Sequence, residues 1–154
     1  MRVLFVCLGN ICRSPTAQGV LQQQLFQAGL AERVEVASAG TGAWHVGKPP
    51  DARSQRAALA RNYDLSAQRA QQVSVADFQH YDFIFAMDRS NLADLKRLQP
   101  AGSRAELDLF LRRFDAPVDE VPDPYYDGDA GFEQVLDLIE HACQGLVSEL
   151  RGRL

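Results

Sequence analysis

Val6-Cys7-Leu8-Gly9-Asn10-Ile11-Cys12-Arg13-Ser14-Pro15 is the stretch that decides the fold, because it joins an expected strand to an expected helix. The apolar run that precedes it predicts a buried β-strand ending at Cys7. Gly9 and Asn10 favour a tight turn, since glycine lacks a side chain and asparagine tolerates a left-handed backbone. Ser14 is a good helix N-cap and Pro15 suits the first helical turn. We therefore expect a strand, a short loop and a helix in immediate succession.

The loop between Cys7 and Arg13 has the composition of an anion site with a nucleophile. Five intervening residues are enough to wrap backbone N–H groups around one tetrahedral anion, and a helix N-terminus adds positive charge. The planar guanidinium of Arg13 can bind two phosphate oxygens at once. Positive groups of this kind favour the nucleophilic thiolate form of a cysteine, and the Ser14 hydroxyl could donate a hydrogen bond to Cys7. The simpler alternative is a buried cysteine at a strand end, followed by an ordinary turn.

Hydrophobic patterns along the rest of the chain predict alternating strands and helices. This order is typical of an α/β fold: a single-domain three-layer structure with a four-stranded parallel sheet flanked by helices on both faces. Binding sites in such sheets lie at the carboxyl ends of the strands, where Cys7 is expected. The expected strands are 2–7, 34–37, 83–87 and 107–110, and the expected helices are 15–29, 51–62, 73–78, 88–98 (capped by Asp88 or Ser90) and 130–150.

Composition narrows the class of protein. The 154 residues suit one domain spanning 1–154, and a net charge of −4 without a basic tract argues against a nucleic-acid partner. No apolar run reaches membrane-spanning length and no secretory signal is evident, so we expect no membrane association and a cytoplasmic location. The three cysteines do not form a disulfide framework, and His45, His80 and His141 have no metal-ligand spacing. Neither a metal nor a cofactor is expected.

The string from Cys7 to Pro15 resembles the phosphate-binding loop of the low-molecular-weight protein tyrosine phosphatases. Its place near the N-terminus, the chain length and the later motifs agree, so the resemblance covers essentially the whole chain. It implies Cys7 as nucleophile and a phosphotyrosine-bearing protein as substrate. Inorganic phosphate or other oxyanions are the implied inhibitors. The residues implied to bind phosphate are Cys7, Leu8, Gly9, Asn10, Ile11, Cys12, Arg13 and Ser14.

A second motif, Pro122-Asp123-Pro124-Tyr125-Tyr126, supplies a candidate proton donor. A tyrosine phenol has a pKa of about 10, so its oxygen leaves more easily when it is protonated as the bond breaks. The flanking prolines restrict the backbone around Asp123. In the family that this chain resembles, Asp-Pro-Tyr-Tyr is the general-acid loop, which implies that role for Asp123. Asp-Pro alone is a common turn, and the neighbouring acids Asp119, Glu120, Asp127 and Asp129 are expected to be solvated loop charges.

Three aromatic residues are candidate walls of the substrate cleft. Trp44, the only tryptophan, lies in a glycine-rich loop, and Tyr125 and Tyr126 follow the candidate acid. Stacking of these rings on a phenyl group would give the cleft depth, so that phosphotyrosine reaches Cys7 and phosphoserine does not. Packing of Trp44 in the core is the alternative.

Residues outside the motif are expected to support the loop. Ser38, in a Ser-Ala-Gly-Thr string that resembles the family's, would hold Asn10 together with Ser14. Relatives often carry a histidine and, later, an arginine after the segment Leu65-Ser66, and this chain has Gln68 and Gln71 at those neighbouring positions. This difference puts the family's histidine brace on Asn10 in doubt.

Cys12 is a candidate redox partner, because a disulfide with Cys7 would shield the nucleophile from irreversible oxidation. A small buried loop residue is the alternative role.

Three other functions are alternatives to tyrosine phosphatase activity. Arsenate reductases have a similar loop but need a relay of further cysteines, and Cys143 on an apolar helix face is the only one left. The resemblance associates phosphoarginine preference with threonine at the Ile11 position, so Ile11 favours tyrosine. A phosphate-binding module without catalysis would lack the nucleophile or the acid, and both are present.

Overall fold

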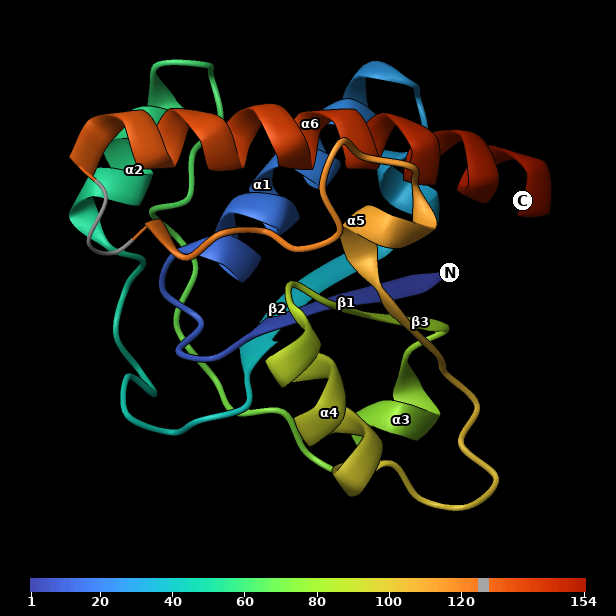
Figure 1. Cartoon of the computed structure of the whole chain (residues 1–154). Helices are drawn as coiled ribbons and strands as arrows, with labels where there is room; N and C mark the ends of the chain where they lie inside the picture. Colours follow the sequence, from blue (N-terminus) through green and yellow to red (C-terminus); the bar gives the residue numbers. More distant parts are fainter. Residues whose placement is uncertain (125–127) are drawn as a thin grey trace.

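Four parallel strands form the central sheet of the computed structural model, which describes residues 1–124 and 128–154 (Figure 1). The strands are β1 Arg2–Cys7, β2 Glu35–Gly40, β3 Phe83–Ala86 and β4 Glu106–Leu109, in the order β2-β1-β3-β4. In the register of the sheet, Cys7 is paired with Gly40 and Val6 with Ala86. The last residue of β1 therefore lies at the carboxyl edge of the sheet, beside the end of β2.

Helices cover both faces of this sheet, which confirms the predicted three-layer α/β arrangement. In Figure 1, α1, α2, α5 and α6 lie over one face and α3 and α4 over the other. The helices are α1 Arg13–Gln27, α2 Ala52–Leu59, α3 Asp77–His80, α4 Arg89–Leu98, α5 Phe110–Arg113 and α6 Gly128–Arg153, with a short 3-10 helix, η1, at Ala31–Arg33. Among the helices of the described segments, none is both long and apolar enough to cross a membrane.

Strand β1 is buried on both of its faces. Successive side chains of a strand point to opposite sides. Val3 and Phe5 accordingly pack in a core cluster with residues of α1 and α6, whereas Leu4 and Val6 pack in a second cluster with Phe78 of α3 and Leu95 of α4. Burial in two cores fixes the position of the strand, and with it the position of Cys7 at its end.

Two of the predicted helices, 73–78 and 51–62, differ most from the structure. The helix expected at 73–78 is wrong in position: Gln72 forms an isolated bridge with Gly40, and the helical turn begins only at Asp77. The helix expected to reach residue 62 ends at Leu59, and Asn62 has a left-handed φ of 70°. The turns η1 and α5 were not expected.

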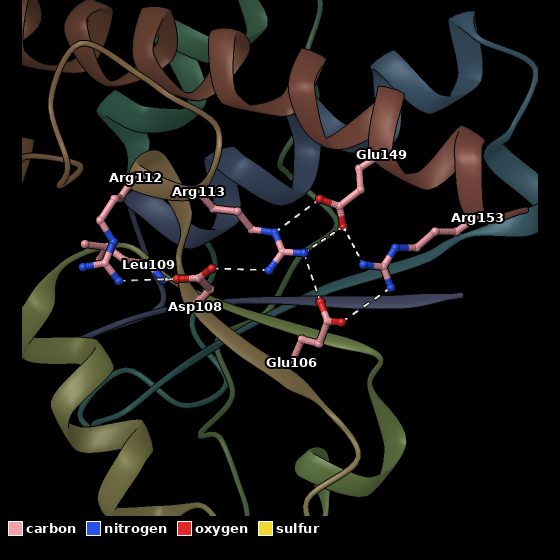
Figure 2. A network of polar contacts seen from close by, with 7 residues as sticks. All are labelled: Glu106, Asp108, Leu109, Arg112, Arg113, Glu149 and Arg153. Atoms are coloured by element: carbon pink, nitrogen blue, oxygen red, sulfur yellow. Dashed lines mark hydrogen bonds and ion pairs between the residues drawn. The ribbon is translucent and has the colours of Figure 1, made fainter.

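A network of ion pairs links α5 and α6 to the edge strand β4 (Figure 2). The guanidinium of Arg113 lies 3.0 Å from Glu106, 3.3 Å from Asp108 and 2.8 Å from Glu149. Arg153 pairs with Glu106 and Glu149. Because Glu106 begins β4, this network extends to the amino end of the strand, and none of its residues lines the cleft around Cys7.

Candidate active site

The phosphate loop, defined here as Cys7–Ser14, is held open by its neighbours. Backbone N–H groups of Thr41, Gly42 and Asp51 donate to the carbonyls of Cys7 (2.9 Å), Leu8 (2.9 Å) and Ile11 (2.8 Å), respectively. These bonds draw the loop carbonyls toward the surrounding segments.

Asn10 and Gly40 show the steric constraints on the backbone of the phosphate loop. Asn10 has a left-handed φ of 57°, as predicted. A Cβ on Gly40 would lie 2.7 Å from the Leu8 carbonyl oxygen, so only glycine lets β2 approach the loop this closely. Gly9 does not have a positive φ; instead, a Cβ there would crowd the ring of His45 at 3.0 Å.

The sulfur of Cys7 has two hydrogen-bonding neighbours. Its Sγ lies 3.0 Å from Ser14 Oγ and accepts a hydrogen bond of 3.3 Å from the backbone N–H of Asn10. Both groups can stabilise a thiolate. The prediction that Ser14 N-caps the helix is wrong, because α1 already begins at Arg13 and the cap position falls on Cys12, with no side-chain cap. The Ser14 hydroxyl faces Cys7 instead.

Asn10 is the centre of a buried hydrogen-bond network that ends at the sulfur. Its Nδ2 donates to Ser14 Oγ (2.8 Å) and to Ser38 Oγ (2.9 Å), which confirms the predicted contact with Ser38. Because an amide nitrogen can only donate, each hydroxyl uses its oxygen to accept and keeps its proton for another acceptor. The Ser14 proton can therefore be directed to Cys7.

Gln68 and Gln71, at the positions where relatives often carry a histidine and an arginine, take part in this network. The backbone N–H of Gln71 donates to Asn10 Oδ1 at 3.0 Å. The Ser38 hydroxyl donates to Gln68 Oε1 at 3.4 Å, and Gln68 Nε2 donates to the carbonyl of Pro15 at 3.0 Å. Asn10 is thus braced on both sides without a histidine.

Arg13 is buried and held by a carboxylate that the sequence reasoning missed. Its Nη1 donates to Asp88 Oδ2 at 2.6 Å and to the carbonyl of Val121 at 3.3 Å. Burial lowers the pKa of the guanidinium, but the charges of Cys7 and Asp88 raise it by more, so the net shift is upward. Asp88 also N-caps α4 through its Oδ1, which accepts from Asn91 N at 2.7 Å; the cap was predicted, whereas the contact with Arg13 was not. The one feature of the sequence that could have indicated a functional role for Asp88 is its place directly after a buried strand.

The acid loop, defined here as residues 115–124, brings Asp123 to the same cleft. This loop is attached to the end of β3 at Val121, whose backbone N–H donates to the Met87 carbonyl at 2.8 Å. Asp119 and Glu120 were predicted to be solvated loop charges, but both contact Arg89. Arg89 Nη2 donates to Asp119 Oδ2 at 2.7 Å, and the backbone N–H of Arg89 donates to Glu120 Oε2 at 2.8 Å. Tyr125, Tyr126 and Asp127 lie outside the described residues.

A cleft of about 300 Å³ opens over the sulfur. Trp44 is 70% exposed, which rules out the alternative that its ring packs in the core. His45, for which the sequence predicted no role, also lines the cleft. The lining residues are Cys7, Leu8, Gly9, Ile11, Cys12, Arg13, Trp44, His45 and Asp123. The structure therefore brings together the predicted thiol, guanidinium and carboxylate.

The other two cysteines differ from Cys7 in their surroundings. Burial, together with the nearby charge of Asp51, raises the pKa of the Cys12 thiol to about 12, although the Ser54 hydroxyl acts in the opposite direction. Burial also raises the pKa of the fully buried Cys143 thiol well above its usual value. Both thiols therefore stay protonated near neutral pH, and neither resembles an activated nucleophile.

Comparison with known proteins identifies the family. Residues 2–153 match the model of the low molecular weight phosphotyrosine protein phosphatase family. The chain is 47% identical over 134 residues to the phosphatase of that name from Schizosaccharomyces pombe, covering 86% of this chain and 85% of the relative. The chain belongs to this family and is an enzyme of the phosphatase class.

Solved structures agree with this assignment. A protein tyrosine phosphatase from Entamoeba histolytica, crystallised with Hepes in its active site, superposes with a TM-score of 0.94 at 38% identity and covers 100% of this chain and 99% of its own. The Drosophila arginine phosphatase superposes with a TM-score of 0.91 at 30% identity, covering 97% and 98%. The same fold therefore occurs in a tyrosine phosphatase and in an arginine phosphatase.

Proposed function

We propose that this protein hydrolyses phosphotyrosine in proteins through a cysteinyl-phosphate intermediate, with Asp123 as general acid. One observation carries the proposal: Cys7, Arg13 and Asp123, from three separate segments, line a single cleft. The sulfur at its floor contacts two groups that favour the thiolate, and the buried guanidinium beside it suits phosphate.

In the first step the Cys7 thiolate attacks phosphorus in line with the bond to the tyrosyl oxygen. Arg13 and the loop amides bind the three equatorial oxygens, which carry the charge of the transition state. The bond from phosphorus to the tyrosyl oxygen breaks, and the protonated Asp123 gives its proton to that oxygen.

In the second step a water molecule attacks the phosphorus atom of the thiophosphate. Asp123, now a carboxylate, accepts the proton of the water as the bond between phosphorus and sulfur breaks. Inorganic phosphate leaves and the thiolate is regenerated. Because phosphate and similar oxyanions occupy the same loop, we expect them to inhibit competitively.

Preference for tyrosine is supported by the walls of the cleft. The exposed ring of Trp44 can stack on a phenyl group, and the side chain of Ile11, which also lines the cleft, offers no hydroxyl to a guanidinium phosphate. Arginine phosphatase activity is the second candidate, favoured by the structural likeness to the Drosophila enzyme.

Hydrolysis of matched phosphotyrosine and phosphoarginine peptides tests both candidates. Wild type, Cys7→Ser and Asp123→Ala are compared. We expect wild type to prefer phosphotyrosine, Cys7→Ser to be inactive, and Asp123→Ala to be strongly impaired. Full activity in Cys7→Ser would overturn the mechanism, and equal rates on both peptides would remove the tyrosine assignment.

Cys12 is proposed as a redox partner of Cys7, and a cytoplasmic location is proposed with it, since such a pair depends on cellular thiols for re-reduction. Peroxide would oxidise the Cys7 thiolate to a sulfenic acid, which condenses with the Cys12 thiol and releases water. Both cysteines line the cleft and both are free thiols in the structure. If peroxide inactivation of Cys12→Ser is as reversible as that of wild type, the role of Cys12 is wrong.

A further inference from the structure

A second hollow, of about 370 Å³, adjoins the cleft over Cys7. It shares Leu8 and Trp44 with the cleft and includes none of the proposed catalytic residues. The hollow is lined by Leu8, Thr41, Gly42, Trp44, Gln72, Val73, Asp94, Leu95 and Leu98. Two neighbouring hollows with a common rim can be occupied by one continuous ligand.

The lining of this hollow is mainly apolar. Leu95 and Leu98 come from α4, and Val73 comes from the segment that precedes α3. Among the described residues that line the hollow, the only charged side chain is Asp94, which is paired with Arg97. Such a surface suits an aliphatic or aromatic side chain, and a carboxylate at its rim repels an acidic one.

Trp44 forms the common rim because Gly42 leaves room for its ring. A Cβ at Gly42 would overlap the six-membered ring of Trp44, so the indole lies directly against the glycine backbone. Its ring is supported there while remaining 70% exposed. Together with Leu8, which is 43% exposed, the ring presents a continuous apolar edge to both hollows.

We propose that the second hollow binds an apolar side chain of the substrate protein that lies close in sequence to the phosphotyrosine. This inference rests on the proposed function, because it assumes a phosphotyrosyl ring in the first hollow. A substrate chain that leaves that hollow across Leu8 and Trp44 enters the second one directly. The two hollows share Leu8 and Trp44, and an extended chain advances about 3.3–3.6 Å per residue. We therefore expect the bound side chain within about three positions of the phosphotyrosine.

Peptides with single changes around the phosphotyrosine test the proposal. In each peptide one of the three positions on either side carries Leu, Gly or Glu, and kcat/KM is measured for wild type and for Leu98→Gln. We expect Leu to be preferred over Gly by about tenfold at one position, mainly through KM, with Glu the poorest. Leu98→Gln should reduce this preference to about twofold while hydrolysis of p-nitrophenyl phosphate stays unchanged.

One further variant serves as a control, and another replaces Leu98→Gln if that variant does not fold. Leu59→Gln is the matched control, since Leu59 is 61% exposed on α2 and lines neither hollow; its peptide preference should equal that of wild type. If Leu98→Gln proves unstable in thermal unfolding, Asp94→Asn replaces it, and the penalty for Glu should shrink.

Two outcomes would overturn the subsite. One is the absence of any positional preference in wild type, and the other is a preference that neither hollow variant alters. If Leu98→Gln instead changes the sedimentation of the protein and not its peptide preference, the hollow is an interface between copies of this chain. p-Nitrophenyl phosphate has no peptide chain and does not test the subsite. If wild type fails to hydrolyse it, the proposed phosphatase mechanism is contradicted and not the subsite.

Discussion

The phosphate loop and the acid loop serve the same cleft, but they are held in different ways. In the phosphate loop, Cys7, Asn10 and Ser14 are at most 3% exposed and share one hydrogen-bond network. In the acid loop, Asp123 is exposed, and its anchor lies two residues away at Val121. The proposed nucleophile is therefore preorganised within the core. The proposed acid is exposed to solvent, which suits a group that would activate water in the second step. Substitutions in the phosphate loop should accordingly affect every substrate, and those in the acid loop mainly substrates with poor leaving groups.

Asn10→Ala should have the largest effect, because it removes the centre of the network that holds Ser14 and Ser38. We expect kcat to fall by about a hundredfold, comparable to the loss of an oxyanion donor. The free energy of unfolding should fall by about 1–3 kcal/mol.

Asn62→Ala is the matched control, since Asn62 also has a left-handed φ but is exposed. It should cost about 1–2 kcal/mol of stability through backbone strain and leave kcat unchanged. Wild-type kcat in Asn10→Ala would show that the network does not prepare the nucleophile.

Asp88→Asn should have the next largest effect, because it removes the charge that holds Arg13 and keeps a side chain able to cap α4. We expect kcat/KM for phosphotyrosine to fall by about ten- to thirtyfold as the buried guanidinium loses its partner. Binding of inorganic phosphate, measured by calorimetry, should weaken in parallel. Ser90→Ala, at an exposed position two residues away, should change neither quantity. Unaltered phosphate affinity in Asp88→Asn would mean that Arg13 is positioned without the ion pair.

Arg89→Gln should have a small effect that depends on the leaving group. Arg89 contacts Asp119 and Glu120 in the acid loop, but it is 55% exposed, and exposed pairs contribute about 0.2–1 kcal/mol. We expect hydrolysis of phenyl phosphate to slow by about two- to threefold at low salt and less at high salt. Hydrolysis of p-nitrophenyl phosphate, which needs less protonation, should not change.

Arg104→Gln is a close control for this prediction. Arg104 is equally exposed and makes an ion pair of the same length, 2.7 Å, with Asp82, which lies outside the cleft. Its rates should match wild type on both substrates. An equal loss on both substrates in Arg89→Gln would show that Arg89 does not act through the acid.

Arg113→Met should leave catalysis unchanged and lower stability. Arg113 is largely buried among Glu106, Asp108 and Glu149 (Figure 2), and none of these residues lines the cleft around Cys7. We expect the free energy of unfolding in urea to fall by about 2 kcal/mol, because three carboxylates lose a shared cation. Arg112→Met, which removes an exposed partner of Asp108, should cost less than about 0.5 kcal/mol. A changed kcat in Arg113→Met would contradict the separation of this ion-pair network from the cleft around Cys7.

The contrast between the loops also explains what could be predicted from sequence. The strand, the left-handed Asn10 and the run from Cys7 to Arg13 depend on residues adjacent in the chain, and these were predicted. The contacts of Arg13 with Asp88 and Val121 join segments 75 and 108 positions apart, so no local pattern indicates them. Ser14 was expected both to cap the helix and to hydrogen-bond Cys7, and only the contact with the sulfur forms, because α1 already begins at Arg13.

Rapid acid quenching tests the central claim most directly, by locating the phosphate on the enzyme. Wild type, Asp123→Ala and Cys7→Ser are mixed with p-nitrophenyl phosphate, quenched within milliseconds and digested for mass spectrometry. We predict one phosphate, on Cys7, with a larger fraction in Asp123→Ala because hydrolysis of the intermediate lacks its base, and none in Cys7→Ser. Phosphate on another residue, or turnover by Cys7→Ser without a phosphoenzyme, would contradict the account.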